Sequence, residues 1–159
     1  MKIDIRAASP GDIPVLLALI KKLAEFEKLA HQVEATPERL RATLFPERGA
    51  PAAEFLLARA DGEPVGYAAL FPTYSTFLAK AGLHLEDLFV VEEWRGRGIG
   101  RALLSHAASL AAGRGCGRLE WTVLDWNRPA IDFYASMGAD TLPDWRVCRL
   151  SGDALARHA

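Results

Sequence analysis

Residues 85–100 constrain the fold more than any other stretch, because an apolar run leads directly into a glycine-rich turn and a helical pattern. The run Leu85–Val91 predicts a strand, and Arg95–Gly100 predicts a turn that opens a helix. Glycines let backbone N–H groups converge, and the N-terminus of the following helix adds positive dipole. The stretch therefore predicts a site for a phosphate or pyrophosphate, next to strand carboxylates that could move protons.

The spacing of the glycines excludes two common phosphate-binding motifs. A P-loop requires a lysine directly after its last glycine, and none follows Gly100. The dinucleotide fingerprint Gly-x-Gly-x-x-Gly fails because its third glycine, counted from Gly96, would fall on Arg101. The pattern that remains is Arg-x-x-Gly-x-Gly, with Arg95, Gly98 and Gly100 as its fixed points. A plain tight turn before an amphipathic helix is the alternative interpretation.

Length and composition limit the classes to which the chain could belong. Its 159 residues predict a single domain, residues 1–159, with a core of its own. The net charge of −1 argues against a nucleic-acid or anionic-membrane partner. No apolar run approaches the roughly 20 residues of a membrane span. The two cysteines, Cys116 and Cys148, form no CxxC motif and predict a reducing, cytoplasmic location.

Hydrophobic spacing, caps and turn residues divide the chain into helices and strands. We expect strands at residues 3–6, 54–59, 64–71, 83–91, 118–124 and 145–150, and helices at residues 9–26, 36–45, 98–113 and 127–137. Asp61-Gly62 predicts a hairpin turn, and residues 74–82 predict a connection. The mixture predicts an α+β or α/β fold, with one sheet flanked by helices.

The strand before the glycine turn carries the candidate proton-transfer residues. Alternate residues of a regular strand share a face. One face would then hold His84, Glu86, Leu88 and Val90, and the other Leu85, Asp87, Phe89 and Val91. Glu86 and Asp87 could face one substrate only if a β-bulge intervened. Either Glu86 or His84 could act as a base, whereas solvated or locally paired carboxylates are the structural alternative.

Asn127 and Tyr134 lie on the last long helical pattern and have structural as well as functional interpretations. Asn127 precedes Arg128-Pro129 and is expected to cap the helix. Tyr134 shares an apolar stripe with Ile131 and Met137, which favours a packed tyrosine. No Cys/His spacing suggests zinc, so no metal is expected. The absence of Gly-x-Ser-x-Gly argues against a serine hydrolase.

With these motifs in place, the chain resembles the GNAT acyltransferases over nearly all of its length. The resemblance rests on the Arg-x-x-Gly-x-Gly turn, followed by Asn127, then Phe133-Tyr134, then Gly138-Ala139. Residues 74–78 followed by 85–90 are most similar to the diamine, polyamine (spermidine/spermine) and thialysine N-acetyltransferase branch. The resemblance implies the GNAT fold, an α/β sandwich with a single mixed central β-sheet flanked by helices. It also implies direct transfer of acetyl from acetyl-CoA to a primary amine.

The resemblance further implies roles for individual residues. Glu86 matches the branch's water-relayed base, and Tyr134 matches the tyrosine that protonates the departing CoA thiolate. Backbone amides of Phe89, Val90 and Val91 would hold the pantetheine arm, and Asn127 would reach the cofactor. The pyrophosphate would lie on the main chain of the turn, which comprises Arg95, Gly96, Arg97, Gly98, Ile99, Gly100 and Arg101.

The implied acceptor is a small amine, either a diamine or polyamine or a thialysine or lysine analogue. A cationic acceptor favours a negative trough, for which Glu25, Glu27 and Asp87 are candidates. The segment 140–145 carries only two carboxylates, which disfavours long polyamines. The branch is usually homodimeric. Two alternatives stay open: transfer to a protein or peptide amine, and a non-catalytic acyl-CoA sensor, against which Glu86, Asn127 and Tyr134 together argue.

Overall fold

In the computed structural model, which describes residues 1–159, the chain divides after Thr122 into two units. The first is Met1–Thr122 and the second is Val123–Ala159. None of the helices in either unit is both long and apolar enough to cross a membrane.

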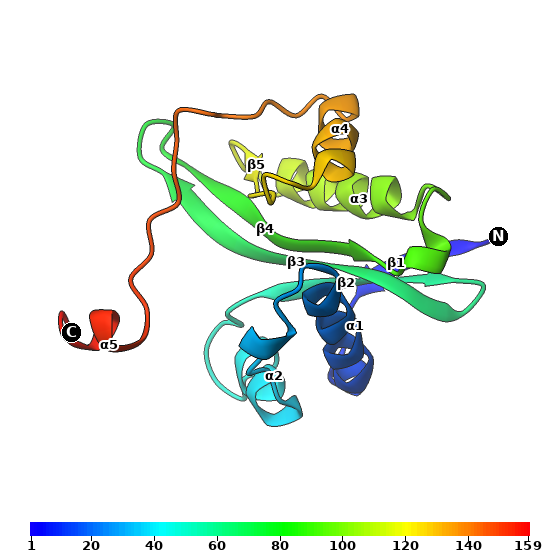
Figure 1. Ribbon diagram of the computed structural model, residues 1–159, viewed down its shortest axis with the longest axis horizontal. Helices are drawn as coiled ribbons and strands as arrows, with labels where there is room; N and C mark the ends of the chain where they lie inside the picture. Colours follow the sequence, from blue (N-terminus) through cyan, green and yellow to red (C-terminus); the bar gives the residue numbers. More distant parts are fainter. The chain divides into compact units, whose positions relative to one another are not determined.

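A five-stranded sheet organises the first unit, with its strands in the order β1-β2-β3-β4-β5 (Figure 1). The strands are β1 Ile3–Ala7, β2 Glu54–Ala60, β3 Glu63–Ser75, β4 Lys80–Val90 and β5 Leu119–Glu120. Neighbours are antiparallel from β1 to β4, whereas β5 runs parallel to β4. Between β2 and β3, Asp61 and Gly62 have positive φ angles of 49° and 91°, as a two-residue hairpin requires. The single mixed sheet and this turn are confirmed.

Helices cover both faces of this sheet, as the sequence predicts. Figure 1 shows α1 (Ile13–Phe26) and α2 (Pro37–Leu44) on one face and α3 (Ile99–Gly113) on the other. The α1 side chains Ile13, Leu16 and Leu19 recur at helical spacing and are buried. Each such burial contributes about 1.5–3 kcal/mol. Three short 3₁₀ turns complete the unit: η1 Pro10–Asp12, η2 Ala30–Gln32 and η3 Glu92–Trp94.

The hairpin of β3 and β4 is longer than the sequence indicates. Pairing continues through Tyr74 opposite Ala81 and Ser75 opposite Lys80, so the expected connection at 74–82 shrinks to residues 76–79. The Ser75 hydroxyl accepts a hydrogen bond from the N–H of Leu78 at 3.2 Å, which closes this short turn. Pairing with the opposite strand therefore makes residues 74–75 and 80–82 part of the strands, although their small and polar residues favour strands only weakly.

The second unit contains two helices, α4 Arg128–Ser136 and α5 Gly152–Ala156. The predicted helix at 127–137 is confirmed, and α5 has no counterpart among the predicted elements. The predicted strand at 145–150 is wrong, because these residues form no strand. A strand forms only where its backbone pairs with that of another strand, and the second unit contains no strand. The run at 118–124 likewise pairs only at Leu119–Glu120.

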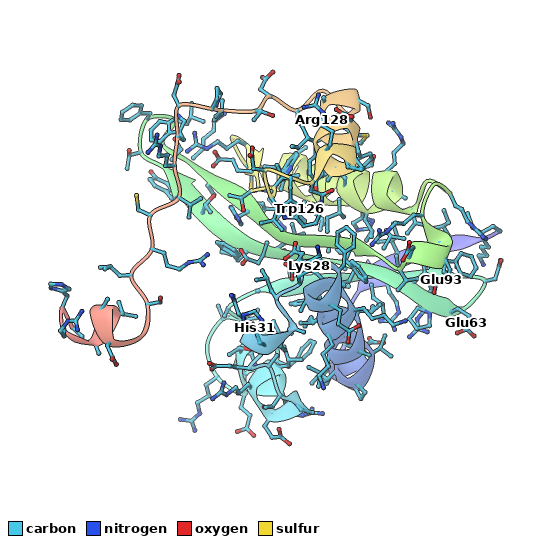
Figure 2. The ribbon with its side chains drawn as sticks, viewed as in Figure 1. Lys28, His31, Glu63, Glu93, Trp126 and Arg128 are labelled. Carbon is cyan, nitrogen blue, oxygen red and sulfur yellow. The ribbon has the colours of Figure 1, made fainter.

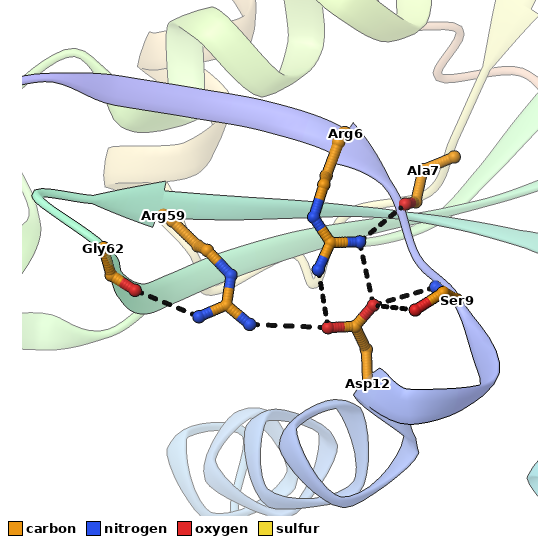
Figure 3. Close-up of polar contacts among 6 residues, drawn as sticks. All are labelled: Arg6, Ala7, Ser9, Asp12, Arg59 and Gly62. Carbon is orange, nitrogen blue, oxygen red and sulfur yellow. Dashed lines mark hydrogen bonds and ion pairs between the residues drawn. The ribbon is translucent and has the colours of Figure 1, made fainter.

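A charged network at Asp12 joins β1 and β2 to the start of α1 (Figure 3). The Asp12 carboxylate is buried and accepts two hydrogen bonds from the Arg6 guanidinium, at 2.8 and 2.9 Å. It also accepts from the N–H and the hydroxyl of Ser9, at 2.8 and 2.7 Å. Arg59 approaches it to 3.4 Å. The predicted helix start at Ser9, with Asp12 reaching back, is confirmed.

Asp12→Asn is expected to lower the free energy of unfolding at pH 7 by about 2 kcal/mol, because charge-assisted hydrogen bonds are lost. The Arg6 guanidinium holds the pKa of Asp12 well below its usual range. A depressed folded-state pKa stabilises the fold above the unfolded value, near 4, and this stability is lost as the pH falls further. Chemical denaturation at pH 7 and at stepwise lower pH should therefore show a difference that shrinks in acid. The exposed carboxylate variant Asp125→Asn is the control, and equal stability at pH 7 would contradict the assignment.

Candidate active site

The glycine turn after β4 has the backbone geometry of an anion cradle. The chain passes from β4 through η3, where Glu93 lies (Figure 2), and reaches Gly96 and Gly98 before α3 begins at Ile99. Gly96 and Gly98 have φ angles of 72° and 84°, which residues with a Cβ rarely adopt. Space is not the constraint, since a Cβ on either would meet nothing within 4 Å.

The electrostatics of the cradle favour a negatively charged ligand. The Gly98 carbonyl accepts from the N–H of Ala102 at 2.9 Å, which leaves the preceding N–H groups of α3 without intrahelical partners. No acidic residue lies in the first turn of α3. Arg95, Arg97 and Arg101 add positive charge, and their residues are exposed. Helix dipole, open N–H groups and cations together suit a pyrophosphate.

The edge of β4 beside the cradle offers main-chain groups to a ligand. The N–H of Val91 donates to the Val65 carbonyl at 2.9 Å, so it belongs to the ladder with β3. Successive residues of an antiparallel strand direct their N–H and carbonyl groups to opposite edges, so those of Val90 point away from β3. They point to the edge of β4 where β5 pairs only with Leu83 and His84. The Val90 carbonyl accepts from Nε of Arg95 at 2.9 Å. Among the three predicted amides, that of Val90 therefore points to this edge.

A β-bulge at Glu86 changes which side chains of β4 share a face. Asp87 pairs with Ala69 and Leu85 pairs with Leu70, so Glu86 has no partner residue on β3. The regular alternation expected from the sequence is therefore wrong beyond Glu86. Asp87 and the residues after it exchange faces, which brings Asp87 to the side that carries His84. This is the condition under which Glu86 and Asp87 can face one substrate.

Asp87 is half-buried, and its neighbours have opposite effects on its pKa. Its Oδ2 accepts a hydrogen bond from the Tyr67 hydroxyl at 2.9 Å. Burial raises the pKa of Asp87, the Tyr67 hydrogen bond lowers it, and the nearby charge of Glu86 raises it. Burial and the charge of Asp87 likewise raise the pKa of Glu27. The charge of Glu86 therefore acts on Asp87, and the charge of Asp87 acts on Glu27.

Glu27 reaches this cluster because of the way α1 ends. It is the C-cap residue of α1, and Lys28 beyond it has a φ of 59° (Figure 2). The N–H of Leu29 donates to the Ala24 carbonyl at 2.8 Å, and the N–H of Lys28 donates to the Glu25 carbonyl at 3.0 Å. These two bonds form a Schellman motif, which fixes the backbone at Glu27.

The other acceptor candidate on α1, Glu25, has a different environment. It is exposed and lines a hollow of about 300 Å³, together with Lys21, Ala30, Val33 and Ala35. No interaction links it to Asp87, whereas the charge of Asp87 raises the pKa of Glu27. Glu27 and Asp87 are therefore the two acceptor candidates that the fold brings together.

His84 and Glu86, the two candidate bases, are neighbours in space. His84 Nε2 lies 3.6 Å from Glu86 Oε2, and the imidazole stacks on Phe71 with ring centroids 4.8 Å apart. The Glu86 side chain is 62% exposed, so solvent can reach it for proton exchange. Because the groups are in contact, both stay candidates for accepting a proton.

Arg95 links the cradle to the end of α1. Its guanidinium carbon lies 4.4 Å from the centre of the Phe26 ring and 5.8 Å from that of Phe89. Such cation–π contacts contribute about 0.5–1 kcal/mol at exposed sites. Arg95 therefore connects the predicted pyrophosphate turn with the segment that carries Glu27.

In the second unit, Asn127 and Tyr134 occupy the helix predicted for them. The Asn127 side chain accepts from the N–H of Ala130 at 3.4 Å, so its capping role is confirmed. Tyr134 lies in α4, and its ring is 5.3 Å from that of Phe133 in a tilted arrangement. Trp126 and Arg128 flank the cap (Figure 2). The catalytic and cofactor roles of Asn127 and Tyr134 stay predictions.

Tyr67 and Phe71 contact candidate site residues, and the sequence did not single them out. Both lie on β3, opposite Phe89 and His84 respectively. The available signal was a tyrosine inside the apolar run 65–71, since a buried phenol usually needs a hydrogen-bond partner. The identity of that partner depends on the β3–β4 register, which the sequence leaves open.

Comparison with known proteins assigns the chain to a family. The profile of the "Acetyltransferase (GNAT) family" matches residues 20–139, which cover parts of both units. The chain is 40% identical to thialysine N-epsilon-acetyltransferase of Bos taurus, over 98% of this chain and 96% of that protein. It is 35% identical to L-ornithine N5-acetyltransferase NATA1 of Arabidopsis thaliana, over 95% of this chain and 85% of that protein.

A solved structure shares the fold of this chain. An integron cassette protein of V. cholerae matches 99% of this chain and 98% of its own length, with a TM-score of 0.81 and 24% identity. The family profile, the sequence relatives and the fold therefore agree on one class of enzyme, whose members use acetyl-CoA. The chain belongs to the GNAT acetyltransferase family and is an N-acetyltransferase.

Proposed function

We propose that this enzyme transfers acetyl from acetyl-CoA to the primary amine of a small, cationic acceptor. Candidate acceptors are diamines or polyamines and amino acids with a side-chain amine, such as thialysine, lysine or ornithine. The observation that carries the proposal is the carboxylate cluster of Glu27, Glu86 and Asp87. None of the ion pairs of the protein involves Glu27 or Asp87, so a cationic ligand would find uncompensated charge there.

The residues of the glycine turn suit the acyl donor. The main chain from Arg95 to Arg101 would hold the pyrophosphate, as the positive φ angles of Gly96 and Gly98 and the N-terminus of α3 support. The pantetheine arm would follow β4 at Phe89, Val90 and Val91, with the Val90 amide as the main donor. When bound, acetyl-CoA supplies an activated acetyl thioester.

Glu86 is proposed as the general base. An alkyl ammonium has a pKa near 10, so at neutral pH it must lose a proton before its nitrogen can attack a carbonyl carbon. Glu86 would take that proton directly or through a water molecule, with His84 next to it as a second acceptor. A group in this role accelerates a reaction by about 10²–10⁴-fold.

Tyr134 is proposed to protonate the departing thiolate, and Asn127 to contact the cofactor. These assignments rest on the match of Asn127, Phe133-Tyr134 and Gly138-Ala139 to the family pattern. A phenol can serve as the donor because its ordinary pKa of about 10 keeps it protonated at neutral pH.

The decisive test is release of free CoA thiol from acetyl-CoA by the purified protein. The acceptor panel comprises putrescine, spermidine, ornithine, thialysine, lysine and several peptides, with a blank that lacks acceptor. Turnover with a free diamine or amino acid above the blank is the expected result. Turnover with peptides alone would replace the small-amine proposal with a protein acetyltransferase, and acetyl-CoA binding without turnover would favour the sensor.

We further propose that residues 1–159 act as one acetyltransferase domain, in a cytoplasmic homodimer. The family match supports the single domain, because it extends across the boundary at Thr122. The free cysteines Cys116 and Cys148 are compatible with a reducing compartment. The dimer rests on the resemblance alone. Sedimentation equilibrium would test it, and a mass near 17.4 kDa at micromolar concentration would reject it.

A further inference from the structure

We propose that Tyr67 is a positioning residue for the acceptor amine, and that it acts by holding the carboxylate of Asp87 in one orientation. The inference rests on the proposed function, since it assumes a cationic acceptor at the carboxylate cluster. Tyr67 belongs neither to the proposed cofactor site nor to the proposed general base, so its role is an additional one.

The Tyr67 ring is held rigidly in the sheet. Its residue is 0% exposed. Its ring stacks on that of Phe55, with centroids 5.5 Å apart and planes inclined by 14°, and it also contacts the Phe89 ring at 6.3 Å. These contacts hold the ring between β2 and β4 and place its hydroxyl beside Asp87. The hydroxyl donates to Asp87 Oδ2 at 2.9 Å.

The hydrogen bond decides what Asp87 can offer to a ligand. It occupies Oδ2 and restricts rotation of the carboxylate, while Oδ1 keeps its lone pairs for another donor. No basic side chain of the first unit forms an ion pair with Asp87. An alkyl ammonium carries three N–H donors and could donate one of them to Oδ1 while Glu27 compensates its charge.

The same bond favours the charged form of Asp87, which burial disfavours. Burial and the charge of Glu86 raise the pKa of Asp87, and the Tyr67 hydroxyl opposes this rise. Burial and Asp87 raise the pKa of Tyr67 itself, so the phenol stays a donor throughout the working pH range. Loss of the hydroxyl would therefore raise the pKa of Asp87 further and favour its neutral form, which binds an ammonium poorly.

Tyr67→Phe tests the inference, because it removes the hydroxyl and keeps the ring between Phe55 and Phe89. We expect the KM for the amine to rise about tenfold, as the loss of a hydrogen bond to a charged group implies. The KM for acetyl-CoA and kcat should stay within about twofold. The pH below which kcat/KM for the amine falls should move upward. Tyr74→Phe is the matched control, since it removes the same hydroxyl from the exposed end of the same strand.

A double-mutant cycle with Asp87→Asn separates positioning from packing. If Tyr67 acts through Asp87, Tyr67→Phe should add little to the KM of the Asp87→Asn enzyme. An unchanged KM for the amine in Tyr67→Phe would overturn the inference. So would a parallel loss of kcat, acetyl-CoA affinity and thermal stability, which would indicate a structural role.

The inference can be judged separately from the proposed function. If the wild-type enzyme acetylates no amine in the panel, the proposed function fails. Carboxyl ¹³C NMR titration of Asp87 in wild type and Tyr67→Phe still measures the effect of the phenol, with a higher pKa expected in the variant. Equal titration of Asp87 in the two proteins would reject the inference whichever substrate the enzyme uses.

Discussion

Tyr134→Phe is expected to lower kcat by about 10²–10⁴-fold while the affinity for CoA stays close to the wild-type value. The phenol is the proposed proton donor to the departing thiolate, and phenylalanine keeps the ring that packs beside Phe133 in α4. Without a donor the thiolate would have to leave unprotonated or take its proton from water. Steady-state thiol release and calorimetric titration with CoA measure the two quantities independently.

Tyr74→Phe again provides the control for hydroxyl loss, because Tyr74 is 65% exposed on β3. Unchanged turnover in Tyr134→Phe would remove Tyr134 from the mechanism. Loss of CoA binding together with turnover would instead assign Tyr134 to the binding of the cofactor. A circular dichroism spectrum equal to that of the wild type would show that α4 is intact in the variant.

Glu86→Gln is expected to lower kcat/KM for the amine by about 10²–10⁴-fold at pH 7, since the proposed base is lost while size and polarity are kept. The loss should shrink as the pH approaches 10, because a growing fraction of the alkyl amine is then already deprotonated. Thiol-release rates from pH 7 to 10 with the preferred amine measure this dependence. A constant ratio of wild-type to variant rates would contradict the assignment of Glu86 as a base.

A variant of His84 is needed beside Glu86→Gln, because the two side chains are 3.6 Å apart and either could accept the proton. Glu63→Gln, at the β2–β3 hairpin (Figure 2), controls for the loss of an exposed carboxylate. A small effect of Glu86→Gln with a large effect of His84→Gln would transfer the role of base to the imidazole. Comparable losses in both single variants and in the double variant would indicate that the pair works as a unit.

The features that the sequence predicted correctly depend on short-range rules. The start of α1 at Ser9 and Asp12 and the cap at Asn127 follow from local hydrogen bonds between side chains and nearby backbone. The Asp61-Gly62 turn and the cradle at Gly98 follow from the backbone angles that those residues tolerate. For this reason the glycine turn and the helices on either side of the sheet could be predicted from the sequence.

The arrangement of the carboxylates depended on pairing between strands. Periodicity of two placed Glu86 and Asp87 on opposite faces, and only the register of β4 against β3 reveals the bulge that removes this separation. The same register sets Tyr67 beside Asp87 and Phe71 beside His84. A bulge is a property of two strands together, so the sequence of one strand does not specify it.

Strand length illustrates the same limit. The apolar alternation at 145–150 predicts a strand as clearly as the one at 3–6, yet only the latter has a partner, β2. Conversely, Tyr74 and Ser75 extend β3 because Ala81 and Lys80 pair with them. The sequence by itself determined the glycine turn and the helix caps, since these depend on local conformation. The tertiary structure decided which strands form and which side chains meet, because backbone pairing joins residues that are distant in the chain.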